Sequence, residues 1–94
     1  MAADRVAIQH AGDKLVAEGP RLRFPYQSAA QGEVGKGMRE LRPRRGRCVW
    51  RPIYRQVDRR TFVVLAVAPE AQTDTRGFDA ALSRAKARFD ELEL

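Results

Sequence analysis

Cysteine and histidine are almost absent from this 94-residue chain, which contains only Cys48 and His10. A single cysteine excludes an internal disulfide framework, and the sequence has no Cys/His cluster of the kind that binds a structural metal ion. We interpret His10 as an exposed residue of a helix, and Cys48 as a small core residue in preference to a reactive thiol. The sequence therefore predicts neither a metal nor a cofactor.

Long apolar runs are also lacking, since none approaches the roughly 18 residues that a membrane-spanning helix needs. The N-terminus does not show the charged and then apolar pattern of a secretory signal. We therefore expect a cytoplasmic protein that has no membrane partner. Repeats and low-complexity tracts are absent as well, and a chain of this length predicts one domain over residues 1–94.

Basic residues, in contrast, are abundant and unevenly placed. The net charge is +6 and the pI is near 10.4. Residues 36–60 hold ten basic and two acidic residues, a net +8, whereas residues 1–35 are neutral and residues 61–94 carry −2. Nine of the ten basic residues are arginines, whose planar guanidinium suits bidentate contacts with phosphate. This composition favours a polyanionic partner such as RNA, DNA or an acidic protein. The alternative is a solvated turn region kept soluble by its charge.

Two helices are predicted, one near each end of the chain. The first covers residues 4–18 and stops at Gly19-Pro20, because proline cannot continue a helix. The second begins near Asp74 or Thr75, either of which can cap it. Its apolar residues form one continuous stripe at helical spacing: Phe78, Ala81, Leu82, Ala85, Phe89 and Leu92.

Three strands are predicted between the helices, at residues 38–42, 48–57 and 61–68. Because short turns join them, we expect an antiparallel meander, with the nearly apolar run at 61–68 as its central strand, covered on both faces. The preceding stretch, residues 21–37, reads as an irregular connection with a short helical turn around Gln27–Gln31. These elements predict an α+β fold of two layers, a three-stranded meander packed against both helices.

The arginine-rich strand gives a candidate nucleic-acid site. If Arg47, Arg51 and Arg55 lie on one strand, alternation places all three on the same face, unless Pro52 introduces a bulge. Two residues along a strand span about 7 Å, close to the repeat of phosphates along a nucleic-acid strand. Arg42 on the neighbouring strand can join this face. The opposite face would carry Cys48, Trp50 and Tyr54.

Such a surface has most of what RNA cleavage requires. A 2′-hydroxyl attacks the adjacent phosphate, and arginines can stabilise the charge that develops. Proton transfer needs a further group, for which the candidates are Tyr54, Glu40 and Glu70. Arginines around Tyr54 would favour its phenolate form. The alternative is that Tyr54 is a half-buried structural residue of its strand.

Several segments together resemble a known family. The first helix is followed by Glu-Gly-Pro at 18–20, Arg-Glu-Leu-Arg at 39–42, Trp-Arg-Pro-Ile-Tyr-Arg at 50–55 and an apolar strand at 62–67. In this order they resemble the HigB-like branch of the RelE/ParE toxin superfamily, over most of the chain from about Asp4 to Glu93.

The resemblance implies the toxin of a type II toxin–antitoxin system. RelE-like and HigB-like members are ribosome-dependent ribonucleases that cut messenger RNA and are neutralised by a cognate antitoxin protein, whereas ParE-like members poison DNA gyrase. The catalytic candidates carried over are Arg42 and Arg51, with Tyr54 as a further one. The nucleic-acid-binding candidates are Arg39, Arg44, Arg45, Arg47 and Arg55.

Two departures from the family pattern keep a third function open. The turn that carries His and Lys in active HigB-like toxins is replaced here by residues 67–71, Val-Ala-Pro-Glu-Ala. The short strand that precedes the first helix in the family is also not found. Either the start of the sequence is truncated, or the sheet has one strand fewer and an edge open to pairing. Both departures favour a catalytically silent relative that acts by binding.

Overall fold

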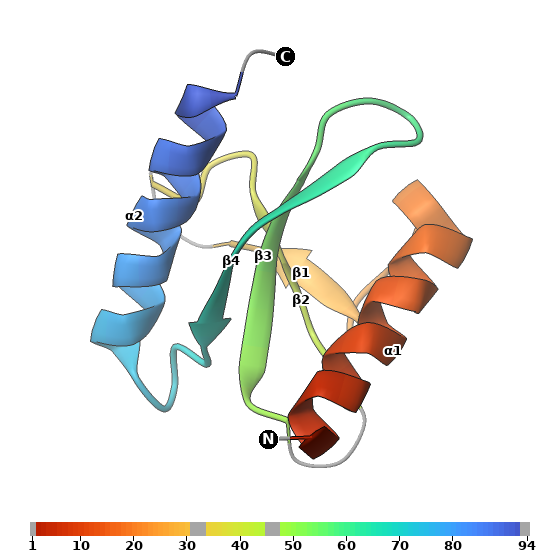
Figure 1. Cartoon of the computed structure of the whole chain (residues 1–94), viewed down its shortest axis with the longest axis horizontal. Helices are drawn as coiled ribbons and strands as arrows, with labels where there is room; N and C mark the ends of the chain where they lie inside the picture. The colour runs from red at the N-terminus through yellow and green to blue at the C-terminus, as the bar shows by residue number, and fades with distance from the viewer. Residues whose placement is uncertain (1, 31–33, 45–47, 93–94) are drawn as a thin grey trace.

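Two long helices flank an antiparallel sheet in the computed structural model, which describes residues 2–30, 34–44 and 48–92. The elements in chain order are α1 (Ala2–Glu18), the short 3-10 helix η1 (Gly19–Arg21), β1 (Gln27–Ala29), β2 (Arg39–Leu41), β3 (Trp50–Gln56), β4 (Phe62–Pro69) and α2 (Thr75–Glu91) (Figure 1). The α+β class and both predicted helices are confirmed. Neither helix has an apolar stretch that is long enough to cross a bilayer.

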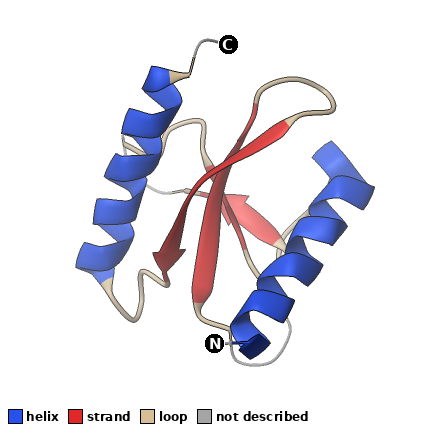
Figure 2. Ribbon diagram, viewed as in Figure 1, coloured by secondary structure: helices blue, strands red, loops and turns tan. Residues whose placement is uncertain are grey.

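The sheet is a meander of four strands in the order β1-β2-β3-β4 (Figure 2). The predicted meander is therefore confirmed, but its three strands are one too few. The helical turn expected around Gln27–Gln31 is wrong, because residues 27–29 form β1, in which Gln27 pairs with Leu41 and Ala29 with Arg39. The sequence of β1 is short and has no apolar alternation, so it carries no local signal of a strand. Residues 27–29 form a strand because they pair with β2. No strand precedes α1 within the described residues.

Strand β4 lies at the edge of the sheet, so the prediction that it is central is wrong. One face packs on α2, while the other exposes 55% of Val64 and 43% of Val67. A bulge adds Leu65 to this strand, because Ile53 pairs with Ala66 and Tyr54 with Val64. The bulge buries the consecutive residues Leu65 and Ala66. The apolar run at residues 61–68 therefore indicated that part of this strand is buried, but it did not indicate which strands are its neighbours in the sheet.

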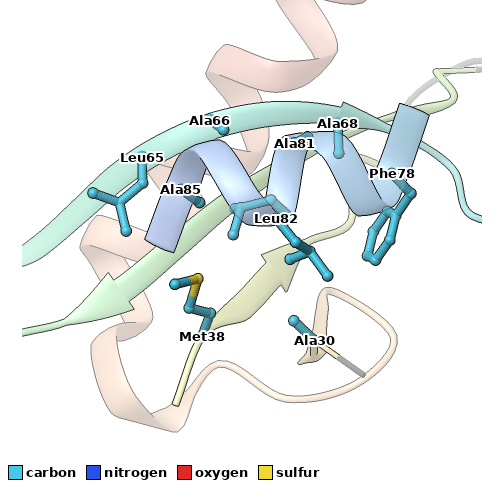
Figure 3. Close-up of a cluster of buried hydrophobic side chains, with 10 residues drawn as sticks. Ala30, Met38, Leu65, Ala66, Ala68, Phe78, Ala81, Leu82 and Ala85 are labelled. Atoms are coloured by element: carbon cyan, nitrogen blue, oxygen red, sulfur yellow. The ribbon is translucent and has the colours of Figure 1, made fainter. Parts of the chain in front are cut away.

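Helix α2 packs most of its predicted apolar stripe against β3 and β4, whereas Leu92 follows the helix and is exposed. Asp74 caps the helix, since its Oδ1 accepts a hydrogen bond of 2.8 Å from the backbone N–H of Gly77. Figure 3 shows the resulting core, in which the stripe faces side chains from the sheet. The buried members from α2 are Phe78, Ala81, Leu82 and Ala85, and those from the sheet side include Ile53, Leu65, Ala66 and Ala68.

Helix α1 packs on the opposite face of the sheet. Ala11 and Leu15 cluster with Leu41 and Tyr54, whereas Ile53, the neighbour of Tyr54 along β3, belongs to the α2 core. Because consecutive strand residues point to opposite faces, the sheet lies between the two helices. The expected two-layer arrangement is therefore wrong. The physical reason is that β3 carries apolar or buried side chains on both of its faces.

Candidate nucleic-acid interface

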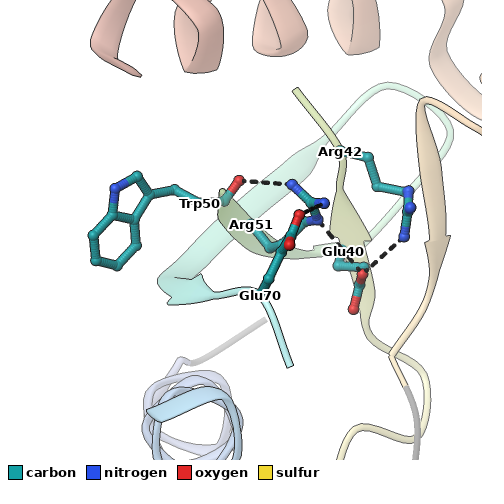
Figure 4. A network of polar contacts seen from close by, with 5 residues as sticks. All are labelled: Glu40, Arg42, Trp50, Arg51 and Glu70. Atoms are coloured by element: carbon teal, nitrogen blue, oxygen red, sulfur yellow. Dashed lines mark hydrogen bonds and ion pairs between the residues drawn. The ribbon is translucent and has the colours of Figure 1, made fainter. Parts of the chain in front are cut away.

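Four charged side chains gather on the α2 side of the sheet and are here called the charged cluster: Glu40, Arg42, Arg51 and Glu70 (Figure 4). Glu40 lies in β2, and Arg42 follows that strand directly. Arg51 lies in the adjacent strand β3, and Glu70 follows β4. The antiparallel meander therefore brings together residues from three segments of the chain.

Glu40 lies between two guanidinium groups. Its Oε1 is 3.4 Å from Nη1 of Arg42 and 3.9 Å from Nε of Arg51. Arg51 also forms an ion pair with Glu70 through Nη2, and its Nη1 donates to the backbone oxygen of Trp50 at 3.4 Å. Only 6% of Arg51 is exposed, so its charge is held in a fixed position. A buried guanidinium requires such partners, because an unpaired buried charge is strongly unfavourable.

The charged cluster lines a groove of about 560 Å³ between the sheet and the start of α2, here called the phosphate groove. Polar groups from β1 and α2 complete its wall, among them Ser28, Thr75 and Asp79. The side chains of Arg42 and Glu70 are 25% and 24% exposed, so both remain accessible to solvent. The groove therefore presents one fixed and one accessible guanidinium beside three carboxylates, those of Glu40, Glu70 and Asp79.

The predicted convergence of Arg42 and Arg51 is confirmed, but Tyr54 does not join them. It lies on the α1 face, is 3% exposed and meets the ring of Phe62 edge-on at 6.0 Å. Burial raises the pKa of Tyr54 above its usual value of 10.0, although the nearby Arg39 acts in the opposite direction. The expectation that arginines favour its phenolate is therefore wrong, because desolvation outweighs the guanidinium.

The other predicted arginines are distributed over the molecule. Arg55 shares the α2 face with Arg51, but its guanidinium stacks over the ring of Phe89 at 4.2 Å. Arg39 lies on the α1 face, where its Nε donates to Oε1 of Gln27 at 2.6 Å. Arg44 lies beside α1 and lines a second cavity. Arg45 and Arg47 lie outside the described residues.

Sequence reasoning missed part of the surroundings of Arg42. The ring of Phe24 lies 5.2 Å from its guanidinium carbon, and the second cavity adds His10, Lys14 and Tyr26. The pairing of Glu40 with Arg42 had a usable signal, because residues two apart on a strand share a face. The contact between Lys14 of α1 and Tyr26, just before β1, had no signal in the sequence, since it depends on how the helix packs on the sheet.

Comparisons with protein-family models, with curated proteins and with solved structures found no match to this chain. Within the described parts of the chain, no three His, Cys, Asp or Glu side chains gather into a potential metal site.

Proposed function

We propose that this chain is the toxin of a type II toxin–antitoxin system and cleaves messenger RNA on the ribosome. The observation that carries the proposal is the position of Glu40 between the guanidinium groups of Arg42 and Arg51 in a solvent-accessible groove. The resemblance to HigB-like toxins assigns a function to those two arginines, and the net +8 of residues 36–60 supports an RNA partner.

The scissile phosphate binds in the phosphate groove by replacing Glu70 on Arg51. Glu70 follows the end of β4, and its carboxylate already occupies the position of an anion on that guanidinium. A phosphate oxygen makes the same kind of contact and can also reach Arg42, whose side chain is more accessible. Arg51 then acts as a fixed charge, because Glu40 holds its other side.

Cleavage follows from the position of Glu40. Its carboxylate takes the proton from the 2′-hydroxyl, whose oxygen attacks the adjacent phosphorus. The bond to the 5′-oxygen breaks, and that oxygen takes a proton from water. The hydroxide ion left behind takes the proton from Glu40, which restores the carboxylate. The products end in a 2′,3′-cyclic phosphate and a 5′-hydroxyl. Both guanidinium groups stabilise the additional negative charge that the phosphate carries in the transition state.

A second candidate function is a catalytically silent toxin-fold protein that acts by binding. Specific observations favour it, because each guanidinium of the charged cluster already has a carboxylate partner and Tyr54 faces away from the groove. In this alternative the charged cluster stabilises the fold, and substitutions in it alter stability without altering any cleavage.

Inducible expression in bacterial cells distinguishes these functions. We expect the wild type to stop growth and incorporation of labelled amino acids, and Glu40→Gln and Arg42→Ala to abolish both effects. Lys86→Gln is the matched control, since Lys86 lies on the exposed side of α2, in an exposed ion pair with Asp90. Unchanged growth with folded wild-type protein present supports the silent alternative. DNA damage with intact translation instead supports a ParE-like gyrase poison.

The cognate antitoxin is part of the same proposal. An acidic segment of such a protein would cover the arginines of residues 36–60 and be steered to them by charge complementarity. We expect the immobilised chain to capture the product of the neighbouring open reading frame, with binding that weakens as salt increases. Failure to capture that product in low salt would contradict this partner.

A further inference from the structure

A second cavity, of about 170 Å³, lies between α1 and the segments next to β1 and β2, and is here called the α1 cavity. Its lining residues are His10, Ala11, Lys14, Tyr26, Arg42 and Arg44. Three of these six side chains are permanently cationic and none is a carboxylate. The charge balance is therefore opposite to that of the phosphate groove, where three carboxylates face two guanidinium groups.

Arg42 belongs to both cavities and has one unpaired donor. Its Nη1 contacts Glu40, but its buried Nε has no hydrogen-bond partner among the described residues. A buried donor without an acceptor is unfavourable, so an acceptor oxygen bound beside this guanidinium would be stabilised. The unpaired Nε favours an acceptor oxygen near Arg42, and the cationic lining of the α1 cavity favours an anion that carries one.

Lys14 is held at the wall of the α1 cavity by a contact with Tyr26. Its Nζ lies 4.1 Å from the centre of the aromatic ring, which is a cation–π distance. The acidic neighbour on α1, Asp13, does not line this cavity and accepts a hydrogen bond of 2.9 Å from Gln9. The charge of Lys14 therefore remains available to a ligand.

We propose that the α1 cavity binds a second phosphate of a single-stranded RNA, adjacent to the phosphate in the phosphate groove. Arg42 then lies between two successive phosphates, and Lys14 and Arg44 contact the one beside α1. The inference rests on the proposed function, and it adds α1 to an interface otherwise built from strand arginines. The RNA backbone would then run from the phosphate groove to the α1 cavity and contact basic residues at both.

Binding of a single-stranded RNA oligonucleotide tests this subsite without any cleavage. A fluorescent hexanucleotide with 2′-O-methyl groups cannot be cut, and its dissociation constant is measured by anisotropy at several salt concentrations. We expect Lys14→Gln to weaken binding about three- to tenfold and to reduce the slope of log K against log salt by about 0.7, the value for one lost contact to single-stranded nucleic acid. Arg44→Gln should do the same, and Arg44 is exposed, so this change does not disturb the core.

Lys86→Gln is again the matched control, because it removes the same charge from the outer surface of α2. If Lys14→Gln and Arg44→Gln bind the oligonucleotide no more weakly than this control, the subsite is wrong, whereas RNA cleavage by the wild type would leave the proposed function intact. If Lys14→Gln weakens binding of adenosine monophosphate but not of the oligonucleotide, the cavity is a mononucleotide site and the RNA proposal is overturned. Absence of salt-dependent RNA binding by the wild type would overturn the subsite and the proposed function together.

Discussion

Two buried polar residues, one on each face of the sheet, have very different surroundings. Arg51 and Tyr54 lie three positions apart on β3, and both are nearly inaccessible to solvent. Arg51 is paired with two carboxylates, whereas Tyr54 lies in an apolar cluster that favours its neutral form. Alternation along the strand predicted that Arg51 and Tyr54 lie on opposite faces, but the sequence could not show how different the surroundings of the two faces are.

The raised pKa of Tyr54 predicts a loss of stability in alkaline solution. Below pH 10 the phenol is protonated in both states, and its contribution to stability is fully present. Above pH 10 the unfolded chain releases the proton while the folded chain retains it, so the free energy of unfolding falls as pH rises towards the folded pKa. Tyr54→Phe should remove this part of the pH dependence. Urea unfolding between about pH 8 and about pH 11 measures it.

The difference in unfolding free energy between wild type and Tyr54→Phe is the decisive quantity in that experiment. It should be constant below pH 10 and should shift in favour of the variant above it. A difference that stays constant over the whole range would contradict the assignment of a desolvated hydroxyl at this position.

Elements differ in how far the sequence determines them. Helix α2 was predictable, because its stripe at helical spacing and its capping residue are both local features. Strand β1 was not, since only the partner β2 makes residues 27–29 a strand. The apolar composition of β4 predicted a central strand. Its actual position at the edge of the sheet depends on the order in which the strands pair, which composition does not determine. The candidate site also combines local and tertiary contacts. Glu40 and Arg42 are close in the sequence, so their contact was predictable. The contacts of Glu70 with Arg51 and of Lys14 with Tyr26 form only through tertiary packing.

The cap of α2 predicts a measurable contribution to stability. Asp74→Ala should lower the free energy of unfolding by about 1 kcal/mol, because the N–H of Gly77 loses its acceptor. Asp90→Ala, in the last turn of the same helix, is the matched control and should have little effect, since its pair with Lys86 is exposed on both sides. Equal effects of the two substitutions in urea unfolding would show that the cap contributes nothing specific.

At the scale of the whole molecule, the phosphate groove and the α1 cavity lie on different sides of the sheet, and Arg42 lines both. The α2 side has the phosphate groove, where three carboxylates face two guanidinium groups, and the α1 side has a cavity lined by cations. Arg42 lies at the boundary of the two. The net +8 of residues 36–60 predicted an anionic partner, but the division of that charge between two faces depends on the fold.

Cleavage of messenger RNA on purified ribosomes tests the proposed function most directly. The wild-type protein and the Lys86→Gln control should cut a programmed message and leave 2′,3′-cyclic phosphate ends, whereas Glu40→Gln should fold normally and leave the message intact. A message that remains whole with the folded wild type, or one that Glu40→Gln cuts at an undiminished rate, would contradict catalysis at the phosphate groove.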